Sequence, residues 1–279
     1  MIQNTENWIE FRRSRIGASD APIIMGVSPW KTPLRLWEEK MGFVTSESNQ
    51  YMRRGLELEE AARKQFEELT GIVVFPEVMV HPEFDWMIAS LDGIDIEHTR
   101  IVEIKCPGKI DHESAMDGVI PEKYIPQLQH QMIVTGLDCA FYFSYNEENC
   151  KLLEISRCKE YENKLLNKEL CFLKCMVDLE PPEPVTKDFK IRNDEIWQKI
   201  ADDYVDIRSK LQILRQREEE LRQSLIHLSG GSNVMGAGIK LSKQIRRGQI
   251  DYKTIPEIQN MNLENMRKKP VEIWRIEEL

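Results

Sequence analysis

Asp92, Glu103 and Lys105 are the residues whose types and spacing point most directly to chemistry. Asp92 closes one apolar run, and Glu103 follows eleven positions later inside a second run, 101–106, that alternates in character. As a β-strand, this run directs Glu103 and Lys105 to one face. Two nearby carboxylates repel each other unless a cation neutralises them, and carboxylate oxygens suit Mg²⁺. The arrangement suggests metal-assisted phosphodiester hydrolysis.

The spacing of these three residues is not specific by itself, because charged residues make up 30% of the chain. In a simpler interpretation, Glu103 and Lys105 face solvent from an edge strand and Asp92 lies in a turn with Gly93. The context favours a site, because the second strand is followed by Cys-Pro-Gly at 106–108 and the first is expected to end at an Asp-Gly turn. Both carboxylates would then lie near strand ends, where sites are often built.

Glu59 is a third candidate carboxylate. It lies on the apolar-periodic face of a helix expected over 51–70, seven residues before Phe66. A glutamate on a buried face needs a partner, and a metal ion shared with Asp92 and Glu103 would be one. The other interpretation is that Glu59 belongs to an acidic first turn that stabilises the helix dipole.

A phosphate-binding cradle is suggested near the N-terminus by Arg12, Arg13 and Arg15, which precede the small-residue turn 17–19. Arginine forks match phosphate oxygens, and a helix N-terminus offers free N–H groups. The alternative is an exposed basic helix end.

Gln127, Gln129 and Gln131 lie two residues apart on a helix expected over 121–136. At that spacing only one or two of them can face a site. The alternative for each is a solvated glutamine.

Composition limits the class of protein. A chain of 279 residues with 41% hydrophobic content is one large domain, or one and a half, with a sizeable core. No apolar run is long enough to span a membrane and the start lacks the regions of a signal peptide, so we expect a cytoplasmic protein. Six cysteines without a Cys-x-x-Cys pair indicate free thiols, mostly buried. Five scattered histidines support neither a zinc site nor a Ser-His-Asp arrangement.

The net charge of −9 is unevenly distributed. Residues 1–185 contain 20 Lys and Arg against 32 Asp and Glu, whereas residues 186–279 contain 18 against 15. Five basic residues lie within 240–253 beside a single acid. Any contact with DNA must therefore use local basic patches, and the overall acidity should make binding depend on cations.

The hydrophobic pattern alternates between helices and strands. Helices are expected at both ends of segment 8–42 and over 51–70, 121–136, 161–178 and 190–228, the last with apolar residues spaced four and three apart and interrupted by Glu218, as in a coiled coil. Strands are expected over 71–80, 86–91, 101–106, 140–145 and 152–155. The Pro-rich run 181–184 indicates a linker. Beyond 230 we expect strands over 239–245, 249–252 and 271–276 and a helix over 256–268.

Several short motifs occur in one order along residues 8–180: Arg15-Ile16-Gly17-Ala18-Ser19-Asp20, Ser28-Pro29-Trp30-Lys31-Thr32-Pro33, Arg54-Gly55 with Glu59, Leu91-Asp92-Gly93, Glu103-Ile104-Lys105-Cys106-Pro107 and Tyr124-x-x-Gln127-x-Gln129. In this order they resemble the YqaJ-like viral recombinase family, relatives of phage lambda exonuclease among the PD-(D/E)XK nucleases. The family usually has proline where Leu91 stands, a position that is not a ligand.

The resemblance implies roles for individual residues. The metal ligands would be the side chains of Glu59, Asp92 and Glu103 and the carbonyl of Ile104. Lys105 would position or deprotonate the attacking water, and Gln127 would lie near the scissile phosphate. Arg12 and Ser19 would hold the phosphate at the 5′ end.

The resemblance also implies an α+β (α/β) fold, with a central mixed sheet flanked by helices in a restriction-endonuclease-like core over 1–180. A linker over 181–189 and a helical extension with a small β element over 190–279 would follow. The implied activity is a 5′→3′ exonuclease on double-stranded DNA ends. It would use Mg²⁺, with two ions and Mn²⁺ as a substitute, and would leave 3′ overhangs for recombination. The implied assembly is a ring of three subunits working beside a single-strand annealing protein, in a phage or prophage context.

Two other functions stay open from the residues. One is a structure-specific or nicking endonuclease on the same core. The other is a non-catalytic DNA-binding or assembly module. The presence of all four candidate catalytic side chains, Glu59, Asp92, Glu103 and Lys105, argues against a protein that has lost its activity. For the C-terminal extension, the long helix packs on its own chain or on a neighbouring subunit, or the extension recruits the annealing partner. We expect its basic residues to grip the duplex; they are Lys240, Lys243, Arg246 and Arg247.

Overall fold

The structure is a computed structural model that describes residues 6–45, 50–246, 248, 255 and 276. The chain divides into two units, Met1–Lys190 and Ile191–Leu279, which are described separately. None of the described helices is long and apolar enough to cross a membrane. The six cysteines are free thiols, as expected, but all are half-buried or exposed rather than buried.

A mixed sheet forms the centre of the first unit. Its strands are β1 (Ile16–Gly17), β2 (Val74–Val80), β3 (Met87–Asp95), β4 (Ile101–Lys105), β5 (Cys139–Tyr145) and β6 (Cys150–Ser156). The order is β1-β3-β4-β5-β6, with β2 paired to β3. The β1–β3 and β4–β5 pairs are parallel and the other pairs are antiparallel. This mixed sheet confirms the predicted fold class.

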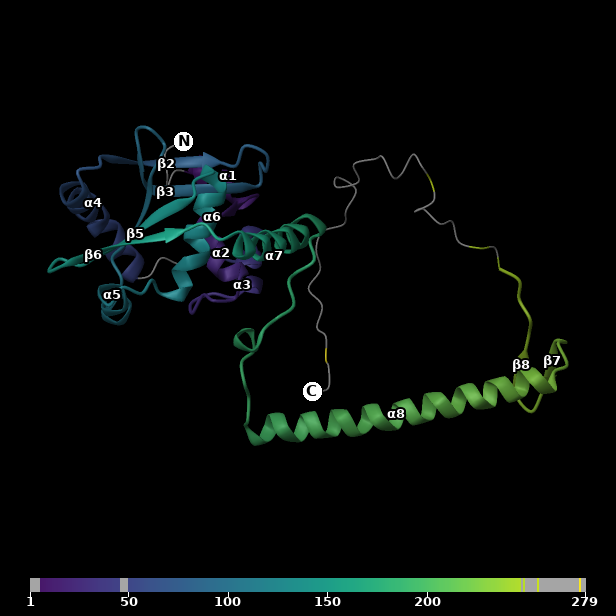
Figure 1. Cartoon of the computed structure of the whole chain (residues 1–279). Helices are drawn as coiled ribbons and strands as arrows, with labels where there is room; N and C mark the ends of the chain where they lie inside the picture. Colours follow the sequence, from purple (N-terminus) through teal and green to yellow (C-terminus); the bar gives the residue numbers. More distant parts are fainter. Residues whose placement is uncertain (1–5, 46–49, 247, 249–254, 256–275, 277–279) are drawn as a thin grey trace. The chain divides into compact units, whose positions relative to one another are not determined.

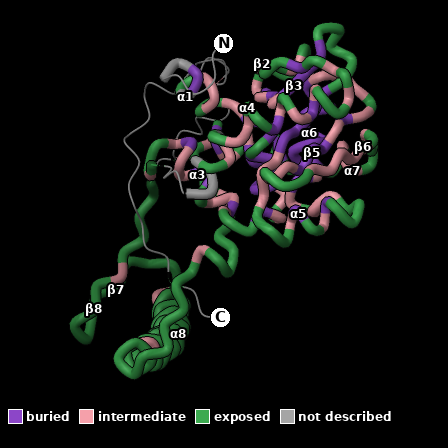
Figure 2. Tube along the Cα trace, turned by 90° about the vertical axis from the view of Figure 1, so that its left-hand side faces the viewer, coloured by how far each residue is buried: buried purple, intermediate pink, exposed green. Residues whose placement is uncertain are grey.

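Helices cover both faces of the sheet (Figures 1 and 2). One face packs against α6 (Ile125–Thr135), together with η1 (Ala18–Asp20), α2 (Ala21–Ile24) and α7 (Lys159–Asp178). The other face packs against α4 (Gln50–Thr70), whose Phe66 contacts the aromatic rings of Phe141 and Phe143 on β5. The remaining helices of the unit are α1 (Glu6–Arg13), α3 (Pro33–Lys40), α5 (Lys109–Met116), η2 (Glu122–Tyr124) and η3 (Thr186–Asp188).

Most of the predicted elements are present, and local capping signals explain their ends. The helix α3 begins after Thr32, whose side-chain oxygen accepts a hydrogen bond from the Arg35 N–H at 3.2 Å, and it has Pro33 at its first position. Gly42, with a φ of +78°, follows its end. The expected helix 51–70 and the strand 140–145 correspond to α4 and β5. The short helix α5 was not predicted.

The prediction of a turn at Asp92-Gly93 is wrong, because β3 continues through both residues to Asp95. The chain reverses after Asp95, whose carboxylate accepts hydrogen bonds from the N–H groups of Thr99 at 2.7 Å and Arg100 at 3.0 Å. Gly93 instead allows the side chains of two neighbouring strands to pack directly against its backbone. An added Cβ would lie 2.7 Å from Cγ1 of Val102 and 2.7 Å from Cγ2 of Val74.

The second unit contains one long helix, α8 (Glu195–Leu228), and a hairpin of β7 (Val234–Gly236) and β8 (Ile239–Leu241). Asp194 caps α8 by accepting a hydrogen bond from the Trp197 N–H at 3.0 Å. No residue of α8 is buried against the described residues (Figure 2). The strand predicted over 239–245 is shorter than expected. Those predicted over 249–252 and 271–276, and the helix over 256–268, lie outside the described residues apart from position 276.

We predict that Gly93→Ala lowers the free energy of unfolding by about 1–3 kcal/mol, because the added methyl overpacks a closed core. Urea unfolding of the full chain measures this change. Gly55→Ala is the control: no atom lies within 4 Å of an added Cβ there, and alanine is the better helix former. A Gly93→Ala protein as stable as the control would contradict the close-packing explanation.

Candidate active site

The position of Glu103 follows from the alternation of β4. Its neighbours Val102 and Ile104 point to the face of the sheet covered by α4, where they join the apolar cluster around Phe66. Glu103 therefore points to the opposite face, under α6, and is only 1% exposed. A carboxylate so deeply buried requires hydrogen-bond donors or a cation.

Three side chains supply those donors. Gln127 Nε2 donates to Glu103 Oε1 at 2.5 Å, the Lys105 ammonium contacts the same oxygen, and Gln131 Nε2 donates to Oε2. Gln127 and Gln131 lie four residues apart on α6 and share one face. Gln129 points elsewhere, donating to the carbonyl of Ser156 at 2.9 Å.

Two of the three glutamines therefore face the site, as the spacing allowed, and none of the three is a solvated surface residue, since all are buried. Gln131, which the sequence analysis named among the three glutamines but gave no role, contacts Glu103. Its position one helical turn after Gln127 was the available signal.

Asp92 reaches the same region from β3. Backbone pairing between β3 and β4 is confined to Gly93 with Val102 and Ile94 with Ile101. Beyond that point the Ile104 N–H donates to Asp92 Oδ2 at 2.9 Å. Burial and the nearby carboxylates of Glu103 and Glu59 raise the pKa of Asp92 well above its usual value. The two predicted carboxylates thus share one electrostatic environment.

Lys105 lies between these carboxylates and an aromatic ring. Burial alone would lower its pKa, but the charges of Glu103 and Asp92 raise the pKa above its ordinary value. Its Nζ lies 5.5 Å from the ring centroid of Tyr124. Lys105 is therefore held as an ammonium that can donate hydrogen bonds at the surface of the site.

Glu59 approaches from α4 and is held by Arg63, which the sequence analysis did not identify. Arg63 Nη2 lies 2.7 Å from Glu59 Oε1, while Arg63 Nε donates to the carbonyl of Asp92 at 3.0 Å. Glu59 is close enough to raise the pKa of Asp92. However, in the part of the chain that the structure describes, no three His, Cys, Asp or Glu side chains converge as a ready-made metal cluster.

The donor set nevertheless fits a hard divalent cation. Asp92 and Glu103 offer carboxylate oxygens in one electrostatic neighbourhood, where a cation would relieve their repulsion. The buried Oε1 of Gln131, beside Glu103, has no hydrogen-bond partner among the described residues. Lys105 supplies only one positive charge for the two carboxylates.

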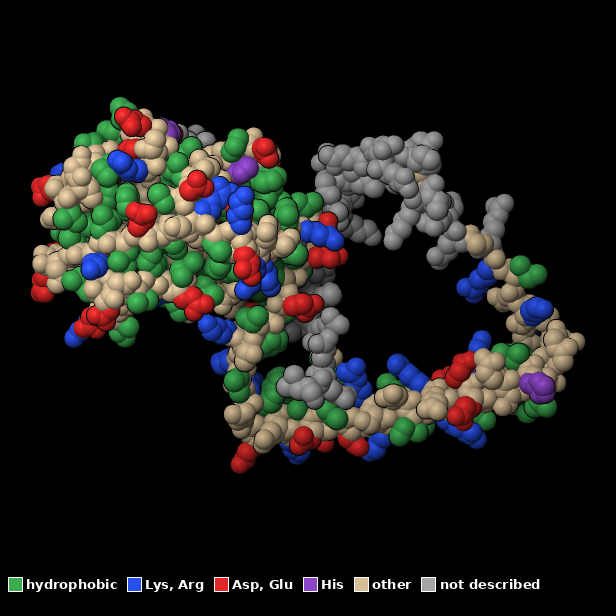
Figure 3. All heavy atoms as spheres, viewed as in Figure 1, with side chains coloured by type: hydrophobic (Ala, Val, Ile, Leu, Met, Phe, Trp, Pro, Cys, Tyr) green, Lys and Arg blue, Asp and Glu red, His purple; other side chains and the backbone are tan. Residues whose placement is uncertain are grey.

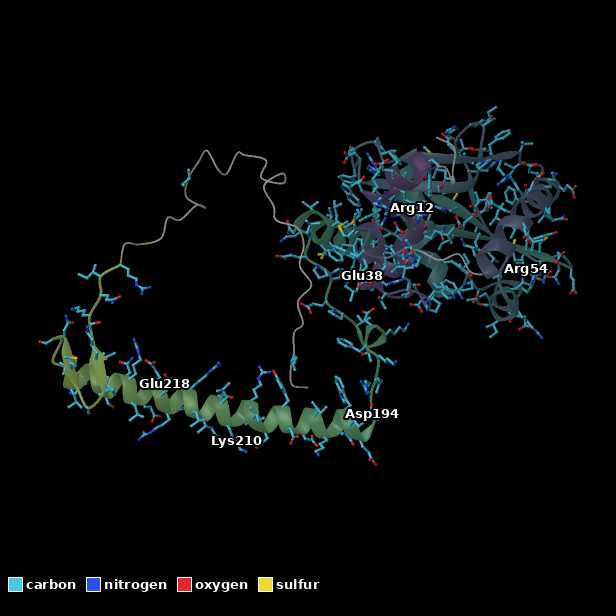
Figure 4. All side chains as sticks on the ribbon, turned by 180° about the vertical axis from the view of Figure 1, so that it is seen from behind. Arg12, Glu38, Arg54, Asp194, Lys210 and Glu218 are labelled. Atoms are coloured by element: carbon cyan, nitrogen blue, oxygen red, sulfur yellow. The ribbon has the colours of Figure 1, made fainter. Side chains whose placement is uncertain are left out.

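The predicted phosphate cradle is organised around a buried acid. Arg12 contacts the Ser19 hydroxyl, and its Nη2 lies 3.0 Å from Asp20 Oδ1 (Arg12 is labelled in Figure 4). Lys40 Nζ lies 2.8 Å from Asp20 Oδ2, which also accepts from the Gly17 N–H at 2.9 Å. The structure thus joins Arg12 with Ser19 and reveals two residues, Asp20 and Lys40, that the sequence analysis did not assign to the site.

The other two arginines of the expected cradle do not join it. Arg15 donates to the carbonyls of Asp85 at 2.9 Å and Phe11 at 3.1 Å, and Arg13 is exposed. Of the basic residues expected to grip DNA, Lys240, Lys243 and Arg246 are exposed in the second unit, and Arg247 lies outside the described residues.

Comparison with known proteins finds a family model that matches part of the chain. Residues 7–138 match the YqaJ-like viral recombinase domain. The uncharacterized protein YqaJ of Bacillus subtilis (strain 168) is 36% identical over 135 residues, which make up 47% of this chain and 42% of that protein. The match therefore spans less than half of the relative.

The fold also matches solved structures of LHK-Exo, an alkaline exonuclease from Laribacter hongkongensis. The structure of that protein in complex with dAMP has 27% sequence identity and a TM-score of 0.56, covering 63% of this chain and 94% of the other. A second structure of it has 28% identity with the same TM-score and coverage.

We predict that Asp20→Asn destabilises the protein by about 3 kcal/mol or more, because it leaves the buried Lys40 ammonium without its counter-charge. Burial alone would raise the pKa of Asp20, but Lys40, Arg12 and the Gly17 N–H hold that pKa well below its usual value. The stabilisation is therefore present above about pH 4 and is lost as the pH falls further. Urea unfolding should show a difference from wild type at pH 7 that shrinks on acidification.

The control for this variant is Glu60→Gln, which removes an exposed ion pair with Lys64. Such pairs contribute little. A similar loss of stability in both variants would show that the Asp20 network has no special role.

Proposed function

We propose, from the match of residues 7–138 to the YqaJ-like viral recombinase domain, that the protein is a Mg²⁺-dependent 5′→3′ exonuclease acting on double-stranded DNA ends. The observation that carries the proposal is the cluster of Asp92, Glu103, Lys105 and Gln127, which lies at the junction of β3, β4 and α6 in a fold similar to that of an alkaline exonuclease. LHK-Exo is an alkaline exonuclease, and its similarity to this chain supports our proposal of an exonuclease reaction here.

In this proposal Asp92 and Glu103 hold the metal, with the Ile104 carbonyl and Glu59 as further ligands. A bound divalent ion supplies Lewis-acid activation of the phosphate and a more acidic water. Arg63 contacts Oε1 of Glu59, so Oε2 is the oxygen that Glu59 would offer to the metal. Gln127 and Gln131 keep Glu103 oriented through both of its oxygens.

Lys105 acts as a hydrogen-bond donor in this mechanism. Without a metal ion, the charges of Glu103 and Asp92 raise the pKa of Lys105, which favours the ammonium form. An ammonium can orient the attacking water or a phosphate oxygen, and it stabilises negative charge that develops on the phosphate. Of the two roles that the resemblance implied for Lys105, we propose positioning, because its ammonium already contacts Glu103.

Arg12 and Ser19 would bind the phosphate at the 5′ end of the substrate. A guanidinium and a hydroxyl that already touch present adjacent donors to a phosphate. Asp20 and Lys40 lie behind Arg12, so that the guanidinium is fixed in place before the substrate arrives.

The biological role that we propose is the production of 3′ single-stranded overhangs for recombination by strand annealing, beside a single-strand annealing protein. Family resemblance suggests a ring of three subunits acting in the bacterial cytoplasm. The exposed Lys240, Lys243 and Arg246 are proposed to contact DNA phosphates, as Arg247 is from its sequence position.

The decisive experiment is digestion of a linear duplex in which one strand is labelled at its 5′ end or, in a parallel substrate, at its 3′ end. With Mg²⁺, we expect early release of the 5′ label and slow shortening of the 3′-labelled strand, and no cleavage with EDTA. Release of the 3′ label first would contradict the polarity. Relaxation of a covalently closed circle would favour the endonuclease, because an exonuclease requires an end.

In the same assay, Lys105→Ala should reduce cleavage by about 100-fold or more while DNA affinity changes little, because its charge acts on the reacting phosphate. The control is Lys109→Ala, a nearby lysine with 86% of its side chain exposed. Full activity of Lys105→Ala would remove Lys105 from the mechanism.

We also predict that a duplex with 5′-phosphate ends is degraded faster than one with 5′-hydroxyl ends, by about tenfold, through charge-assisted bonds to Arg12. Arg12→Ala should abolish this preference, whereas Arg13→Ala, which removes the exposed neighbouring arginine, should retain it. Initial rates on the two substrates measure the ratio. Equal rates for the wild-type protein would exclude the phosphate cradle.

A further inference from the structure

The second unit presents an apolar stripe along α8 that the described residues leave open. From Trp197 to Leu228, the positions that form the stripe alternate regularly between spacings of three and four residues. One series is Ile200, Ile207, Leu214, Leu221 and Leu228, and the alternate series is Trp197, Tyr204, Leu211, Glu218 and Leu225. These ten positions, the seam, correspond to the d and a positions of a coiled coil.

The seam is exposed to an unusual degree for apolar residues. Ile207 is 64% exposed and Leu214 is 65% exposed, and no residue of α8 is buried against the described part of the chain. In proteins most helix stability comes from packing of an apolar face. A helix of 34 residues with such a stripe is therefore built to pack against another helix.

The residues that flank the seam have a strongly biased charge. Of the eight flanking positions, e and g, between Trp197 and Leu228, five are basic and one, Asp203, is acidic. The basic residues are Arg208, Lys210, Arg215, Arg217 and Arg222. Figure 3 shows charged and hydrophobic side chains interspersed along α8, and Figure 4 labels Lys210 and Glu218 on it.

Three of the five flanking bases already contact acids on the outer side of their own helix. Lys210 pairs with Asp206 at 2.6 Å, Arg217 with Glu220 at 2.9 Å and Arg222 with Glu219 at 3.0 Å. Pairs of this kind are exposed and weak, so they are easily exchanged for acids on a second helix.

These charges disfavour a second copy of α8 as the occupant. In a parallel, in-register pair or trio, position g faces the next e, which places Lys210 against Arg215 and Arg217 against Arg222 of the other copy. Only the remaining pair, Asp203 with Arg208, is of opposite charge. Glu218 would also face its own equivalent inside the seam. In an antiparallel pair, e faces e, and every charged e position is an arginine.

A hollow on the seam shows where a partner side chain can enter. Its lining consists of Leu214, Glu218, Leu221 and Leu225 of the seam, the flanking Arg217 and Arg222 and, on the hairpin, Leu241 of β8. An apolar floor beside a guanidinium accommodates a leucine from a helix that carries a glutamate next to it.

We propose that α8 is a docking surface for an amphipathic helix of a different protein, with apolar residues at a and d, acidic residues at e and g, and a basic residue facing Glu218. Complementary charges then replace the repulsion that two copies of α8 would have. The docking surface lies in the second unit, whereas the proposed nuclease site lies in the first. The docking proposal therefore does not depend on the proposed nuclease function.

The test uses the full chain and two synthetic helical peptides of about five heptads, both with leucine at a and d and lysine opposite Glu218. One peptide has glutamate at e and g and the other has lysine there. Fluorescence anisotropy should show the acidic peptide binding at least about tenfold more tightly than the basic one, with an affinity that falls as salt rises. Binding of neither peptide, or tighter binding of the basic one, would overturn the proposal.

Variants of α8 distinguish the contribution of the apolar seam to peptide binding from that of the flanking basic residues. The double variant Leu211→Glu with Leu221→Glu should weaken binding of the acidic peptide by about tenfold or more. Ile213→Glu adds one glutamate, half the charge of the double variant, at a 67% exposed residue off the seam and should change binding little. The triple variant Arg215→Glu, Arg217→Glu and Arg222→Glu should reverse the preference between the peptides.

Two outcomes would assign the surface to another occupant and overturn the proposal. Sedimentation in which the Leu211→Glu with Leu221→Glu variant loses self-association would make α8 an interface between copies of this chain. Direct binding of a duplex DNA that displaces the acidic peptide from the wild-type protein, and that is lost in the triple arginine variant but kept in the double leucine variant, would make it a nucleic-acid surface.

Discussion

The burial of Glu103 is the constraint on which the core of this protein depends. A carboxylate that is 1% exposed has to be matched by donors, and α6 provides two amides while β4 itself provides Lys105. The register of β4 is fixed by the same requirement. A slip of one residue would turn Glu103 toward the Phe66 cluster and would place Val102 and Ile104 under the glutamines. The apolar face and the polar site therefore specify one strand position together.

The residues that sequence reasoning found are those whose local pattern was already anomalous. Glu103 and Lys105 stood out because they are charged within an apolar alternation, and Asp92 because it follows such a run. The helices and strands of the core were predictable for the same reason, since period and capping are local signals. Gln127 came from its place in a family motif rather than from spacing.

The residues that were missed depend on contacts between distant segments. Arg63 matters because it bridges Glu59 and the Asp92 carbonyl, and Lys40 because it is buried against Asp20, yet in sequence both look like ordinary helix surface residues. The prediction of a turn at Asp92-Gly93 was wrong for the opposite reason. A strong local turn signal gave way to tertiary packing, because only glycine fits between Val74 and Val102. Such features cannot be read from a single chain without the pairing of its strands.

One hydrogen bond joins the sheet directly to the chemistry. The Ile104 amide proton is donated to a carboxylate of the neighbouring strand rather than to a backbone carbonyl, at the point where the ladder between β3 and β4 has ended. Its environment therefore changes whenever Asp92 rotates, gains a proton or turns toward a ligand. The backbone amide resonance of residue 104 therefore reports the charge state of Asp92 and its surroundings.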